Sequence, residues 1–106
     1  MITKFKLYKE SYNNNTLNEL IVKYYGDESE SIIEIIDSYD GSIETVQNIL
    51  EKISFLIESV GDVEVLGDDE EPTAYYIDLD DENKRTFIYD IENKKFLLTT
   101  LKKFKH

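Results

Sequence analysis

The side chains in this chain that could do chemistry are carboxylates. The sequence has 23 aspartates and glutamates, no cysteine and one histidine, His106, which is the last residue. Chain ends are usually mobile, and the usual nucleophilic triads need a firmly held histidine or cysteine. A carboxylate pair could still hydrolyse a glycoside, but no pair stands out from the other acids. There is also no glycine-rich phosphate-binding motif. We therefore expect a protein that is not an enzyme.

One stretch partly matches a calcium-binding loop. Asp78, Asp80 and Glu82 occupy the odd positions of such a loop. The rest of the pattern is missing, because Asn83 stands where the sharp turn needs glycine and Tyr89 stands where the last ligand should be glutamate. We favour a solvated acidic turn that discourages edge pairing over a weak calcium-binding module, and we predict no metal site and no cofactor.

Two runs of carboxylates, at 68–71 and 78–82, flank a predicted strand centred on Tyr76. In an antiparallel sheet these runs would lie at opposite ends of that strand. Such a surface could occupy a lysine- and arginine-lined groove built for nucleic acid, with attraction that fades beyond a Debye length of about 8 Å. The alternative is an acidic surface that only keeps the protein dissolved. The candidate partner-binding residues are Asp68, Asp69, Glu70, Glu71, Tyr76, Asp78, Asp80, Asp81 and Glu82.

Tyr76 is the candidate anchor of this surface. Tyr75 and Tyr76 are adjacent on a strand and must face opposite sides of the sheet. Alternation with Ile77 directs Tyr75 to the core and Tyr76 outward. An exposed tyrosine among acids suits a protein contact, because tyrosine is enriched at interface hot spots. The other interpretation is that residues 24–25 or 31–39 cover this face.

Charge is segregated along the chain. Residues 10–92 carry a net −19, whereas residues 1–9 and 93–105 contain lysines and no acid, which leaves a net charge of −11. That sign opposes phosphate binding, so direct nucleic-acid contact is not expected. The terminal lysines would form a basic patch only if the two chain ends were neighbours.

The N-terminal third is predicted to contain a strand and a helix. Residues 2–9 alternate in hydropathy, which is typical of a half-buried strand. Asparagines 13–15 indicate a loop. A helix is expected over 16–25, because Thr16 and Glu19 fit a capping box and apolar residues follow at helical spacing. Gly26 is the expected stop.

Two further segments complete the helical part. Residues 31–39 fit either a short helix or a buried strand, since the run is rich in isoleucine. Residues 42–60 predict the longest helix, with Ser42 as N-cap and Gly61 as stop. Apolar residues recur there at spacings of three and four.

From Asp62 onward the hydropathy period is two, which predicts four short strands separated by acidic or polar turns. The chain is therefore predicted to be a single α+β domain over residues 1–106. A mostly antiparallel sheet, made from the N-terminal strand and the C-terminal β-meander, should pack against the long helix at about 42–60 and one or two shorter helices.

The function expected from these features is binding without catalysis. We expect an acidic protein that inhibits a basic nuclease or other nucleic-acid-binding protein by protein–protein contact, as a phage anti-CRISPR, an anti-restriction protein or a toxin-immunity protein would. The alternative is a small assembly protein that self-associates through a sheet edge. No membrane-spanning or signal segment is visible, which predicts a cytoplasmic location in a bacterial or phage-infected cell. Eleven lysines against one arginine fit an AT-rich genome.

Overall fold

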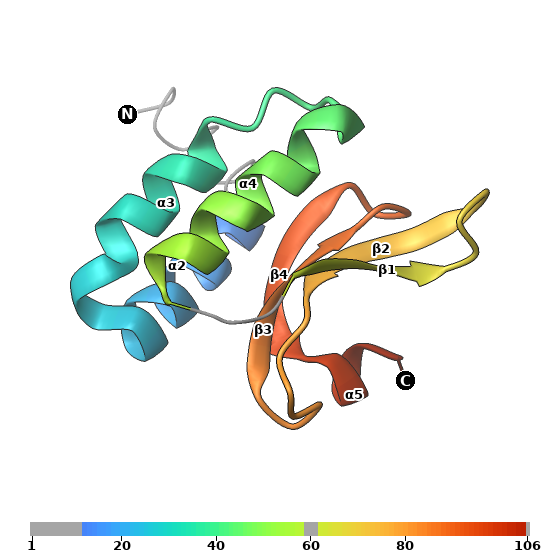
Figure 1. The fold of residues 1–106 in the computed structure, drawn as a ribbon. Helices are drawn as coiled ribbons and strands as arrows, with labels where there is room; N and C mark the ends of the chain where they lie inside the picture. The colour runs from blue at the N-terminus through green and yellow to red at the C-terminus, as the bar shows by residue number, and fades with distance from the viewer. Residues whose placement is uncertain (1–11, 59–61, 106) are drawn as a thin grey trace.

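Three helices cover one face of a four-stranded antiparallel sheet, and a short C-terminal helix lies on the other face (Figure 1). The computed structural model describes residues 12–58 and 62–105. The elements in chain order are α2 (Tyr12–Tyr25), the 3-10 helix η1 (Gly26–Glu28), α3 (Ser29–Asp37), α4 (Ile43–Leu56), β1 (Val63–Gly67), β2 (Pro72–Ile77), β3 (Arg85–Asp90), β4 (Lys95–Thr100) and α5 (Leu101–Lys105). The predicted α+β architecture is confirmed, while the strand predicted at residues 2–9 lies outside the described residues.

Helix α2 extends further toward the N-terminus than predicted. The helix already includes Tyr12, so Thr16 and Glu19 lie in its interior and do not form a capping box. The expected loop at 13–15 is also wrong. Asparagine is only a mildly poor helix former, and a helix propagates at little cost once Leu17 and its neighbours are buried. Gly26, with a φ of 40°, ends the helix as expected.

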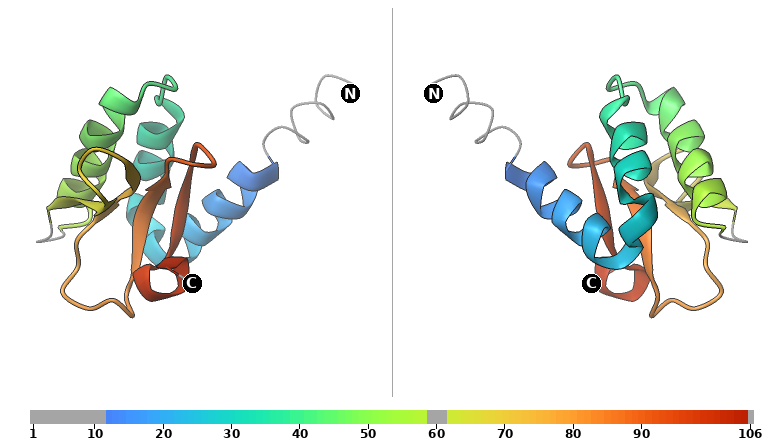
Figure 2. Two further views of the ribbon diagram at one scale, coloured as in Figure 1. Left: turned by 90° about the vertical axis from the view of Figure 1, so that its right-hand side faces the viewer. Right: turned by 90° about the vertical axis from the view of Figure 1, so that its left-hand side faces the viewer.

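The ambiguous segment at 31–39 is helical. Helix α3 spans Ser29–Asp37, and Ile32 is fully buried within it. The other isoleucines are half-buried, and Glu34 is exposed. Helix α3 packs between α2 and α4, which explains how one short helix buries an isoleucine-rich run (Figure 2).

Helix α4 lies against β1 and β2 and is shorter than predicted. Ser42 is its N-cap, as expected, and accepts a hydrogen bond from the Glu44 backbone N–H at 3.2 Å. The helix ends at Leu56, because Glu58 adopts a left-handed φ of 56°, so Gly61 is not the stop. A non-glycine residue in that conformation gives no sequence signal.

The four strands pair in sequence order, as the predicted β-meander requires. Tyr75 pairs with Tyr89, and these residues face the helices together with Ile77, Phe87 and Phe96. The opposite face carries a smaller cluster. Its members are Leu66, Ala74, Tyr76, Ile88, Leu101 and Phe104.

Helix α5, which the sequence analysis did not predict, supplies the last two residues of that cluster. Within the described ranges, no helix is long and apolar enough to cross a membrane.

Candidate functional site

The two predicted acidic runs lie at opposite ends of β2, as expected. Residues 68–71 form the turn between β1 and β2, at the tip of a hairpin that projects away from the helices (Figure 1). Residues 78–82 lie in the connection from β2 to β3, close to α5. The structure therefore does not bring the nine candidate residues together into one cluster, because β2 separates the two runs.

The run at 78–82 is joined by a carboxylate from a neighbouring strand. Glu64 on β1 lies directly across from Tyr76 on β2. Asp78 follows Tyr76 by two residues, and its backbone N–H donates to the Asp62 carbonyl at 2.8 Å, which extends the pairing of the two strands. Tyr76 is half-buried, whereas Glu64 and Asp78 are exposed. The strand pairing and the residue that follows β2 thus bring two carboxylates near one aromatic ring.

The electrostatic surroundings of Tyr76 reflect this arrangement. Burial raises the pKa of its phenol most, and the charges of Asp78, Glu64 and Glu82 raise the pKa further. The Lys105 ammonium acts in the opposite direction. We name Glu64, Tyr76, Asp78, Asp80, Asp81 and Glu82 the Tyr76 surface.

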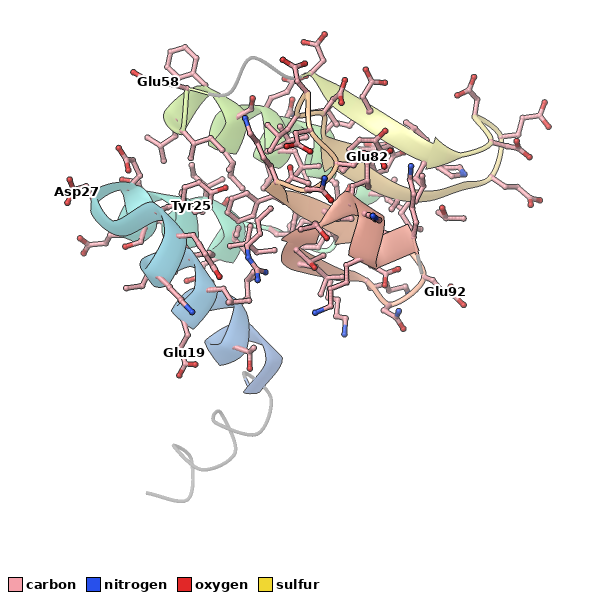
Figure 3. All side chains as sticks on the ribbon, turned by 90° about the horizontal axis from the view of Figure 1, so that it is seen from below. Glu19, Tyr25, Asp27, Glu58, Glu82 and Glu92 are labelled. Carbon is pink, nitrogen blue, oxygen red and sulfur yellow. The ribbon has the colours of Figure 1, made fainter. Side chains whose placement is uncertain are left out.

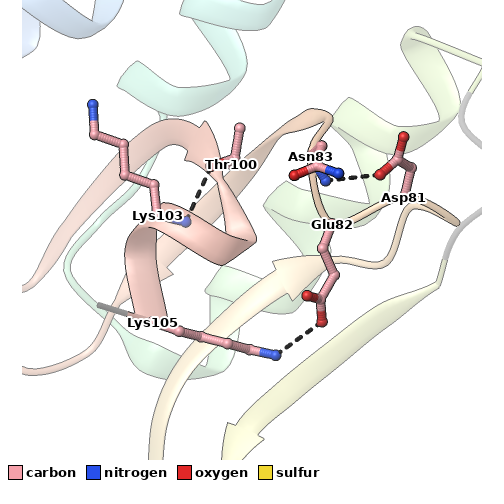
Figure 4. Close-up of polar contacts among 6 residues, drawn as sticks. All are labelled: Asp81, Glu82, Asn83, Thr100, Lys103 and Lys105. Atoms are coloured by element: carbon pink, nitrogen blue, oxygen red, sulfur yellow. Dashed lines mark hydrogen bonds and ion pairs between the residues drawn. The ribbon is translucent and has the colours of Figure 1, made fainter.

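The loop that carries Asp81 and Glu82 is held by α5 (Figure 4). The Lys105 ammonium contacts the Glu82 carboxylate at 3.1 Å, and the Lys102 backbone N–H donates to the Glu82 carbonyl at 3.4 Å. Asp81 accepts a hydrogen bond from the Asn83 backbone N–H at 2.9 Å, which forms an Asx-type turn. These contacts fix the direction in which the loop presents its acids.

Among the residues that the structure describes, most of the acidic charge has no basic partner. In the described part of the chain, Lys105–Glu82 is the single ion pair, and both side chains are substantially exposed. A pair of that kind contributes about 0–1 kcal/mol. The four acids at 68–71 are exposed and form no hydrogen bond or ion pair. The turn at 68–71 is therefore not neutralised by a lysine, and in the run at 78–82 only Glu82 is paired with one.

Acidic side chains also occur away from the predicted runs (Figure 3). Asp27, Glu28 and Glu58 line a polar groove of about 340 Å³ between the end of α2 and the end of α4. Among the described residues, no three carboxylate or histidine groups are placed to hold a metal ion.

Sequence reasoning missed one exposed aromatic residue. The Phe55 side chain on α4 is 87% exposed, beside a groove of about 450 Å³ that Glu34 and Glu51 also line. Its place in the helical pattern could have predicted this exposure, because Phe55 falls outside the apolar stripe that contains the buried residues Val46, Leu50 and Ile53.

The interpretation of the outward sheet face also needs correction. Neither residues 24–25 nor 31–39 cover it, because α5 packs there and leaves Tyr76 half-buried. The prediction that Tyr76 points outward beside Ile88 is confirmed by their pairing.

Comparisons with protein-family models, with curated proteins and with solved structures find no match for this chain.

Proposed function

We propose that this protein is a non-catalytic binding protein that inhibits a basic nucleic-acid-handling protein by direct contact. The observation that carries the proposal is the Tyr76 surface, where Glu64, Asp78 and Glu82 surround a half-buried tyrosine next to the exposed Asp80 and Asp81.

The chemistry of this surface suits a groove lined by lysine and arginine. Carboxylates accept the same charge-assisted hydrogen bonds that phosphates accept, so an acidic surface competes with nucleic acid for one site. The charge accelerates encounter and selects the partner, whereas a desolvated tyrosine slows dissociation. A phage-encoded blocker of a CRISPR or restriction enzyme and a toxin-immunity protein both fit this description.

The fixed loop supports the same conclusion. Glu82 is bound to α5 at two points, and Asp81 shapes its own turn, so binding orders few side chains. A preorganised surface loses less conformational entropy on association. Lys105 covers part of the Glu82 charge in the free protein. A partner lysine or arginine would take its place.

The test is retention of nuclease-containing fractions of a bacterial lysate on immobilised protein, followed by elution with duplex DNA. We expect DNA to displace the retained proteins, because both ligands occupy the same groove. The variant Asp80→Asn, Asp81→Asn, Glu82→Gln should retain at least tenfold less of these proteins.

The matched control is Glu30→Gln, Glu44→Gln, Glu51→Gln, which removes the same charge from exposed helix positions. Equal retention by the loop variant and the control variant would reject the Tyr76 surface. Failure of DNA to displace the proteins would reject the hypothesis that the acidic surface mimics nucleic acid.

A further inference from the structure

Strand β4 lies at one edge of the sheet. The strand order is β1-β2-β3-β4, and β4 pairs only with β3 among the residues that the structure describes. An edge strand presents a row of backbone N–H and C=O groups that can pair with another chain. β4 therefore offers a template for one further strand.

A groove of about 460 Å³ runs along this edge. Five consecutive residues of β4, 95–99, line it. Successive strand residues point to opposite faces, so a lining that includes all five follows the backbone edge and not one face of the sheet. Leu17 and Leu20 of α2 form one wall, and Lys103 and Phe104 of α5 form the other. The groove is thus bounded on both faces and open at the strand edge.

The charge around this groove is opposite to that of the molecule. Lys95 and Lys103 line it, and Lys94 and Lys102 are exposed beside them in the chain. Five of the eight lysines in the described ranges lie between residues 94 and 105, in a chain of net charge −11. Among the described residues, the groove lining includes two lysines and no carboxylate, so the lysines favour an anionic ligand within a Debye length of about 8 Å.

We propose that the groove binds an extended acidic segment of a partner protein, which adds to β4 as a fifth strand. Five residues of β4 correspond to roughly 17 Å of partner strand. Side chains of the added strand would alternate between the two walls. Apolar side chains meet Leu17 and Leu20 on the α2 side, and carboxylates on the α5 side meet Lys95 and Lys103.

A second copy of this chain is a poorer occupant. Two molecules of net charge −11 repel each other, and such charge keeps proteins monomeric. The other sheet edge, β1, carries an irregularity between Leu66 and Gly67 that interrupts regular pairing. The groove and the Tyr76 surface have opposite charge, so they take different partners and are tested separately.

The probe is a fluorescein-labelled heptapeptide in which valine alternates with glutamate. Its binding is measured by fluorescence anisotropy at low ionic strength. We expect it to bind at least tenfold more tightly than the same peptide with lysine in place of glutamate. The protein variant Lys95→Glu, Lys103→Glu should weaken binding at least tenfold. The control variant Lys52→Glu, Lys84→Glu makes the same charge change at exposed positions outside the groove and should leave binding within twofold.

Strand addition has a second readout that leaves the protein unchanged. The hydrogen-bonding groups of successive strand residues point to opposite edges, so methylating alternate amides blocks one edge of the peptide. One N-methylated isomer should lose at least tenfold in affinity, and its complement should not. Equal loss in both isomers, equal binding of both charge types, or no binding of either peptide would each overturn the proposal. So would a dimer in sedimentation that the variant Lys95→Glu, Lys103→Glu abolishes.

Discussion

The hydroxyl groups of Tyr39 and Tyr89 form the hydrogen bond that joins the loop after α3 to the sheet. The two oxygens lie 2.7 Å apart, and both rings pack edge-on against Phe96. Tyr89 is 2% exposed, so its hydroxyl group needs a hydrogen-bond partner within this protein. Burial and the Tyr89 hydroxyl raise the pKa of Tyr39.

Replacing Tyr39 with phenylalanine should therefore lower the free energy of unfolding by about 1–2 kcal/mol, because the buried Tyr89 hydroxyl is left without its partner. Urea denaturation at pH 7 measures the effect. The control is Tyr24→Phe, which alters an exposed ring and should cost less than about 0.5 kcal/mol. Equal costs for the two variants would contradict the role assigned to the pair.

At the scale of elements, the turn between β1 and β2 depends on Gly67. Its φ of 94° lies in the region that favours glycine, and a Cβ there would lie 3.2 Å from the Thr73 backbone nitrogen and 3.3 Å from the Glu71 carbonyl oxygen. Thr73 also donates its hydroxyl proton to the Leu66 carbonyl at 3.1 Å. Close backbone approach and a left-handed conformation thus coincide at one residue.

Gly67→Ala should consequently cost more stability than Gly41→Ala. Gly41 has a similar φ of 91° but nothing within 4 Å of the added Cβ, so it isolates the conformational cost, about 1 kcal/mol. We expect Gly67→Ala to exceed that value by about 1 kcal/mol, because backbone must shift. Chemical denaturation of the two variants side by side measures the difference, and equal values would show that the turn yields without strain.

Over the whole molecule, like charges dominate the surface. The net charge is −11, and one ion pair occurs in the part of the chain that the structure describes. Carboxylates lie on the helices, at the hairpin tip and on the Tyr76 surface, while lysines gather along β4 and α5 (Figure 3). Folding brings the acids closer together than they are in the unfolded chain, so repulsion opposes the native state.

Raising sodium chloride from 0.02 M to 0.5 M should therefore increase the free energy of unfolding, by on the order of 1 kcal/mol, because salt screens repulsion between exposed carboxylates. Urea denaturation at each salt concentration measures the increase. The variant Glu30→Gln, Glu44→Gln, Glu51→Gln should show a smaller increase. A fall in stability with salt would mean that local attraction outweighs the net repulsion.

The sequence patterns located the four strands of the C-terminal meander well and the helix ends poorly. Period-two alternation predicted the β-meander, and the apolar stripe around Val46, Leu50 and Ile53 predicted α4. Both signals repeat over many residues. The end of α4 depends on the left-handed Glu58, and the boundary predicted at residue 16 of α2 is wrong because asparagines 13–15 have only a mild preference against helix. Those boundaries depend on single residues, and packing outweighs single-residue propensity.

The candidate site was predictable in composition and not in geometry. Charge and alternation identified the acids near Tyr76 and the direction in which Tyr76 points, and its pairing with Ile88 confirms that direction. Glu64 joins this surface through strand register, which depends on the turn between β1 and β2. Lys105 reaches Glu82 because α5 folds back over the sheet.

By itself, the sequence determined the acidic charge, the meander and the helical stripe, because each is carried by residue types and local spacing. The tertiary structure decided that α5 covers part of the outer face, that Glu64 joins the Tyr76 surface, and that β4 has an open edge beside lysines among the described residues. These features join residues distant in the chain, and the packing that brings such residues together leaves no local pattern to read.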